Sequence, residues 1–98
     1  MKTDARRFEI MSLYLNNDAL LEYKIDSFRK FLQNSNALPD THRTQNYNFV
    51  LTLRKVTNPN LKWHDSKIEK IIEDVKIKPT SETVWLIGQL QKLKRKKQ

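Results

Sequence analysis

The chain has 98 residues, with 19 Lys and Arg against 11 Asp and Glu, and its formal net charge at pH 7 is +8. This length suits one modest hydrophobic core, so we expect residues 1–98 to form a single helical domain. The absence of cysteine excludes disulfide frameworks, thiolate nucleophiles and cysteine-based metal or lipid sites.

The first third of the sequence predicts two helices separated by a short polar turn. The first helix extends from about Asp4 to Leu15 and ends at the polar pair Asn16-Asn17. We expect its buried face to hold four apolar side chains: Phe8, Met11, Tyr14 and Leu15. The second helix follows Asp18, a favourable capping residue, and its apolar residues recur at a spacing that keeps them on one face. These residues are Leu21, Ile25, Phe28 and Leu32.

Residues 40–57 allow two interpretations. Asp40 can cap a helix, and the apolar residues that follow have helical spacing. Every second residue from Tyr47 to Leu53 is also apolar, as in a strand. We favour a helix because the neighbouring segments are helical, and we keep a strand near 47–53 as the alternative.

The second half of the sequence predicts two further helices after the break at Asn58-Pro59-Asn60. Ser66 and Glu69 have the spacing of a reciprocal capping pair, which predicts that a helix starts at Ser66. We expect Trp63 itself to pack into the core beside this helix. The apolar residues of the fourth helix are Ile68, Ile71, Ile72 and Val75, and those of the fifth are Leu86, Ile87, Leu90 and Leu93.

These elements predict an all-α fold, a compact bundle of about five helices. The helices at 66–75 and 81–96 are typical of a helix-turn-helix-like corner, whose second helix would place Ser81 and Thr83 nearest the bases of DNA. The alternative is an α+β winged-helix variant that uses the strand near 47–53.

Positive charge is concentrated in the second half of the chain. Residues 50–98 carry 12 basic against 5 acidic residues, whereas residues 1–49 carry 7 against 6. The C-terminal helix ends in a basic stretch at 92–98. A helical wheel places Trp85 opposite the leucines of this helix, on a side shared with Gly88, Lys92, Arg95 and Lys96. An exposed aromatic ring among cations suits base stacking and phosphate binding. The alternative is that Trp85 packs against the N-terminal helices, with Gly88 permitting their close approach.

Enzymatic signatures are missing from the sequence. A single glycine excludes Gly-rich phosphate loops and nucleotide fingerprints, and His64-Asp65-Ser66 places adjacent side chains in directions that cannot form a catalytic relay. No group of residues has metal-ligand spacing. We therefore expect neither catalysis, nor a cofactor, nor a metal.

The sequence thus predicts a non-catalytic, accessory or regulatory nucleic-acid-binding protein, with DNA favoured over RNA. The candidate binding residues are Lys76, Lys78, Ser81, Thr83, Trp85, Lys92, Lys94, Arg95, Lys96 and Lys97. The alternative is a protein-interaction module, such as an accessory subunit, an immunity-type inhibitor or an adaptor, that docks its basic face on an acidic protein. The longest apolar run is Val84–Ile87 and no signal-peptide core follows the start, so we expect a cytoplasmic location without membrane insertion.

Overall fold

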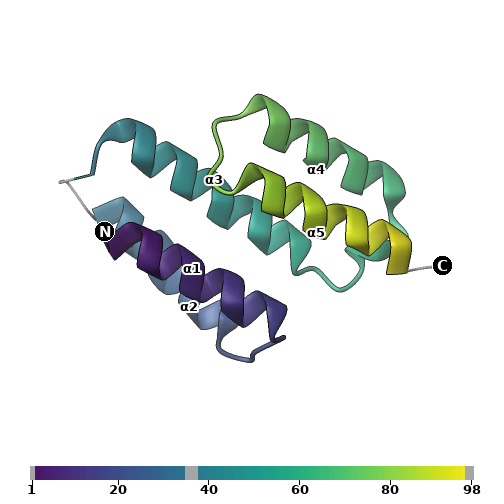
Figure 1. The fold of residues 1–98 in the computed structure, drawn as a ribbon, viewed down its shortest axis with the longest axis horizontal. Helices are drawn as coiled ribbons and strands as arrows, with labels where there is room; N and C mark the ends of the chain where they lie inside the picture. Colours follow the sequence, from purple (N-terminus) through teal and green to yellow (C-terminus); the bar gives the residue numbers. More distant parts are fainter. Residues whose placement is uncertain (1, 35–37, 97–98) are drawn as a thin grey trace. The chain divides into compact units, whose positions relative to one another are not determined.

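The computed structural model describes residues 2–34 and 38–96, and its helices are drawn in Figure 1. The described residues form five α-helices and one 3-10 helix, in the order α1 (Lys2–Leu15), α2 (Leu21–Asn34), α3 (Asp40–Val56), η1 (Leu61–Trp63), α4 (Asp65–Ile77) and α5 (Thr83–Lys96). The predicted all-α fold of about five helices is confirmed. The chain groups into two compact units, Met1–Pro39 and Asp40–Gln98. That these units act as one domain stays a prediction.

Backbone hydrogen bonds and one left-handed residue end α1 and form the turn to α2. Asn17 has a positive φ of 55°, and the Asn17 and Asp18 backbone N–H groups donate to the carbonyls of Tyr14 and Leu13 at 3.1 and 3.0 Å. This is a Schellman motif, in which asparagine takes the left-handed position that glycine usually occupies. The Asp18 carboxylate then accepts a hydrogen bond from the Leu20 N–H at 2.8 Å. Since α2 begins at Leu21, Asp18 stabilises the turn before the helix and does not occupy the predicted cap position.

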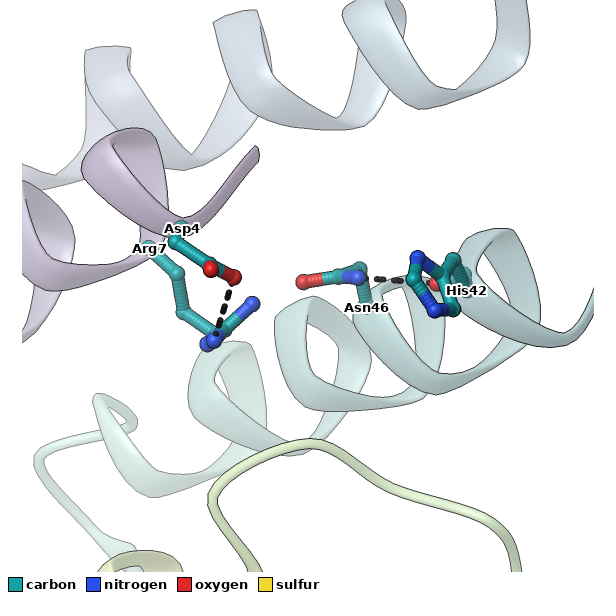
Figure 2. A network of polar contacts seen from close by, with 4 residues as sticks. All are labelled: Asp4, Arg7, His42 and Asn46. Atoms are coloured by element: carbon teal, nitrogen blue, oxygen red, sulfur yellow. Dashed lines mark hydrogen bonds and ion pairs between the residues drawn. The ribbon is translucent and has the colours of Figure 1, made fainter. Parts of the chain in front are cut away.

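The buried face of α1 differs from the predicted one. Ile10 is fully buried, whereas Phe8 and Leu15 are more than half exposed. The buried positions include the polar residue Thr3 and the largely covered side chain of Arg7, whose guanidinium donates to the Asp4 carboxylate at 2.9 Å (Figure 2). The apolar pattern misled because polar residues occupy part of the face that packs.

Helix α2 packs on α1 through the predicted face, on which Ile25, Phe28 and Leu32 are all buried. Two contacts at the surface join the helices of this unit. The Arg6 guanidinium lies 4.4 Å from the centre of the Phe31 ring, and Lys24 Nζ lies 3.3 Å from Glu9 Oε1. Met1–Pro39 therefore contains a helical hairpin with its own apolar contact.

Residues 40–56 are helical, so the alternative of a strand near 47–53 is wrong. Phe49, Val50 and Leu53 are fully buried at the spacing of one helix face, while Leu51 is exposed. The buried amide of Asn46 donates to the backbone carbonyl of His42 at 2.8 Å, one turn earlier in α3 (Figure 2). The sequence fitted both interpretations because apolar residues four positions apart, such as Phe49 and Leu53, lie on one face of a helix and also on one face of a strand.

The start of α4 differs from the prediction. Helix α4 starts at Asp65 after the backbone cap His64, which makes no side-chain capping hydrogen bond. Ser66 consequently lies inside the first turn, and the Glu69 carboxylate contacts Lys94 of α5 instead of the helix start. The predicted Ser66–Glu69 capping pair is therefore wrong, because Glu69 finds a cation on a neighbouring helix.

Helices α4 and α5 pack against each other in an antiparallel pair (Figure 1). They are joined at one end by residues 78–82, and at the other end Glu69 contacts Lys94. Since Glu69 lies eight residues before the end of α4, the helices remain together about 12 Å from their connection. A helix-turn-helix corner crosses at about 90–120°, so the observed pair has a different geometry.

The core of Asp40–Gln98 comes from all its helices. Leu86 and Leu90 of α5 and Ile68 of α4 are completely buried, and α5 contacts α3, α4 and η1. The predicted apolar face of α4 is confirmed, because Ile68, Ile71, Ile72 and Val75 are all buried.

Gly88 supplies a test of the packing of α5. It lies in the middle of this helix, and a Cβ atom added to it would meet no other atom within 4 Å. Glycine within a helix costs about 0.5–1 kcal/mol relative to alanine. We expect Gly88→Ala to raise the free energy of unfolding by about this amount in urea denaturation followed by circular dichroism. A loss of stability would show that α5 is packed on this side.

Candidate nucleic-acid interface

Four elements of Asp40–Gln98 meet at one end of this unit. Helix α3 ends there, four residues lead from it to η1, and η1 contacts both α4 and α5 (Figure 1). Because α4 and α5 are antiparallel, the beginning of α4 lies beside the end of α5. We call the residues of these segments, 54–70 and 91–96, the basic end.

Charge is strongly polarised between the basic end and the rest of its unit. The basic end carries nine basic and two acidic residues, whereas residues 40–53 and 71–90 together carry three basic and four acidic residues. Its basic residues are Arg54, Lys55, Lys62, Lys67, Lys70, Lys92, Lys94, Arg95 and Lys96. Among them, Lys55, Lys67, Lys70 and Lys92 are exposed. Several cations on adjoining helix ends can contact successive phosphates of one strand.

Lys94 of the basic end is engaged with a carboxylate of the same unit. Lys94 Nζ donates a hydrogen bond to the Glu69 carboxylate across the α4–α5 pair. This hydrogen bond raises the pKa of Lys94 above its ordinary value of 10.5, and the nearby carboxylates of Glu69 and Asp65 act in the same direction. Lys94, a predicted phosphate contact, therefore has an internal carboxylate as its partner.

Trp85 packs partly against α3, and Trp63 is exposed where core packing was expected. Trp85 is half-buried, and its ring centre lies 6.4 Å from that of Phe49 in α3, so the expected open face of Trp85 is taken up by packing. Trp63, which we expected in the core, is 61% exposed at the end of η1. The prediction for Trp63 is wrong because its neighbour Leu61 enters the core in its place.

The predicted phosphate-binding lysines lie at two opposite ends of the α4–α5 pair. Lys76 and Lys78 are exposed near the α4–α5 connection, at the opposite end of the helix pair from Lys92. Helix α5 has 14 residues, so its two ends are about 20 Å apart. A single short contact with a strand therefore cannot include both groups.

Ser81 and Thr83, predicted to lie nearest the bases, are half-buried at the α4–α5 connection. The Ser81 N–H donates to the Gln45 carbonyl of α3 at 3.1 Å, and the Thr83 hydroxyl donates to the Thr80 carbonyl at 2.8 Å. The Asn48 amide of α3 also donates to the Pro79 carbonyl at 2.9 Å. These contacts hold the connection against α3 rather than presenting it to a DNA groove.

Three predicted residues lie at the end of the chain. Arg95 and Lys96 belong to the final turn of α5, and Lys97 lies outside the described residues. Within residues 2–34 and 38–96, no three His, Asp or Glu side chains form a group able to hold a metal ion. In the same part of the chain, every helix is too short or too polar to cross a membrane.

Comparison of the chain with protein-family models, with curated proteins and with solved structures found no significant match. Its function is therefore inferred from the residues of the basic end themselves.

The Lys94–Glu69 contact predicts a measurable titration. We expect Glu69→Gln to bring the pKa of Lys94 back toward 10.5, because the charged acceptor is removed. NMR of the Lys94 ε-carbon against pH measures this change. Since the pKa is raised in the folded protein, the contact stabilises the fold below pH 10.5, and this stabilisation is lost as the pH rises through the raised pKa.

The control for this titration is Glu73→Gln, which removes a carboxylate one turn further along α4. It should leave the pKa of Lys94 unchanged. Equal shifts in both variants would mean that general charge, and not the direct contact, acts on Lys94.

Proposed function

We propose that the protein binds nucleic acid without catalysing a reaction on it, and that the phosphates contact the basic end. The observation that carries this proposal is the charge separation within Asp40–Gln98, with nine basic against two acidic residues at one end. Lysines that neutralise phosphates release condensed counterions, and this release supplies most of the affinity in sequence-independent binding.

The arrangement of the cations supports an extended polyanion, such as a nucleic-acid strand, as the ligand. Lys55, Lys62 and Lys92 come from three different elements, α3, η1 and α5, which meet at this end. Charges spread over several helix ends cover more than one phosphate, whereas a single small anion needs one compact pocket. The preference for duplex DNA depended on a helix-turn-helix corner, and the antiparallel α4–α5 pair removes that reason.

An acidic protein is the second candidate ligand of the basic end. The Lys94–Glu69 contact favours it, because a carboxylate already fits among these cations. The two candidates separate by copurification after nuclease treatment, since a protein partner remains bound when nucleic acid has been digested.

The proposal predicts salt-dependent binding that depends on one end of the unit. We expect the logarithm of the association constant for a labelled 20-nucleotide DNA to fall linearly with the logarithm of the salt concentration in fluorescence anisotropy titrations. The double variant Lys55→Gln/Lys92→Gln should flatten this slope by about 1.5, which is the loss of two phosphate contacts.

The matched control is Lys76→Gln/Lys78→Gln, which removes the same charge from exposed lysines at the opposite end of the helix pair. It should change the slope by much less. An equal effect of both double variants would contradict a localised interface, and absence of salt-dependent binding would contradict the proposed function itself.

A further prediction uses the internal carboxylate of the basic end. Glu69→Gln frees Lys94 for a phosphate, so we expect tighter binding and a salt slope steeper by about 0.7–0.9. Glu73→Gln changes the net charge equally without releasing Lys94, and should leave the slope as in the native protein. The proposal that Lys94 faces the ligand fails if both variants show the same slope.

A further inference from the structure

We propose that Trp63 is a base-stacking residue, and that the ligand of the basic end is therefore unpaired nucleic acid, DNA or RNA. This inference rests on the proposed function. Its starting point is the exposure of Trp63, at 61% of its surface. In the described part of Asp40–Gln98, it is the one exposed side chain among Phe, Tyr and Trp.

The backbone that carries Trp63 is hydrogen-bonded in the free protein. Leu61 is buried and anchors η1 in the core. The Trp63 N–H donates to the Asn60 carbonyl at 3.1 Å, and the His64 N–H donates to the Leu61 carbonyl at 2.9 Å. The backbone of such a turn needs little ordering when a ligand binds, so less affinity is lost to backbone conformational entropy.

A cation accompanies the ring. Lys62 Nζ lies 5.1 Å from the centre of the Trp63 ring, within the range of a cation–π contact. In nucleic acid each base is joined to a phosphate through its sugar, so a base on the ring brings its phosphate close to a neighbouring ammonium group. This pairing of an aromatic platform with flanking positive charge is the general chemistry of single-strand binding.

Stacking discriminates between paired and unpaired ligands. In a duplex the faces of the bases are covered by their neighbours, and only a distorted duplex exposes one to a protein ring. Charge alone gives the opposite preference, because a duplex carries one negative charge per about 1.7 Å of its axis. A preference for a single strand therefore measures the contribution of Trp63 against that of the lysines.

The test compares three probes by fluorescence anisotropy: a 12-nucleotide oligothymidylate, the corresponding oligouridylate, and a 12-base-pair DNA duplex. We expect the full-length protein to bind at least one single strand more tightly than the duplex. Trp63→Ala should weaken single-strand binding by about five- to 150-fold, the range of one lost base–aromatic stack, with an unchanged salt slope. Trp63→Phe should retain most of the affinity, because it keeps an aromatic face.

The matched control is Tyr23→Ala, which removes an aromatic side chain with 68% exposure from α2. It should leave all three affinities unchanged. Circular dichroism should show Trp63→Ala folded, since most of this side chain lies outside the core. In a Trp85→Phe background, Trp63 is the remaining tryptophan of the two in the chain, and its fluorescence should be quenched by the bound strand.

The outcomes separate the two proposals. Salt-dependent binding in which the duplex is preferred, or in which Trp63→Ala binds as the native protein does, overturns base stacking and leaves the basic end as a phosphate-binding surface. Absence of salt-dependent binding to all three probes overturns the proposed function and this inference together.

Discussion

The antiparallel packing of α4 on α5 is the contact on which the other features of Asp40–Gln98 depend. The completely buried side chains of Leu86 and Leu90 fix α5 along its length, and α5 also contacts α3 and η1. This packing brings the beginning of α4 to the end of α5, and thereby collects the cations of four elements at one end. An open corner between α4 and α5 would have separated the same residues.

The cations of the basic end also suit the helices that carry them. Arg54 and Lys55 occupy the last turn of α3, and the partial negative charge at a helix C-terminus favours basic side chains by about 0.3–1 kcal/mol each. Asp65 lies in the first turn of α4, where an acidic side chain is favoured for the same reason. Because the C-termini of α3 and α5 meet at this end, the same cations that suit phosphates also stabilise the helices that carry them.

The two tryptophans illustrate how a second packing partner changes the role of a helix face. The wheel of the last helix assumes one buried side, and Trp85 lies away from it. In the structure α5 contacts α3 as well as α4, so Trp85 is half-buried and the polar residue Gln89, one turn later, is buried. Trp63 is left outside because the short helix η1 can direct only part of its surface inward, and Leu61 takes that place.

Local patterns in the sequence predicted the helices and their approximate bounds, although residues 40–57 also fitted a strand, and the uneven charge follows from composition alone. The spacing of Ile68, Ile71 and Val75 and the polar turn at Asn17 are local properties, which neighbouring residues decide. Tertiary structure alone decided that Glu69 contacts Lys94, that Ser81 is held by α3, and that Trp63 is exposed. These features join residues distant in the chain or depend on how several helices share one core, so no local pattern carries them.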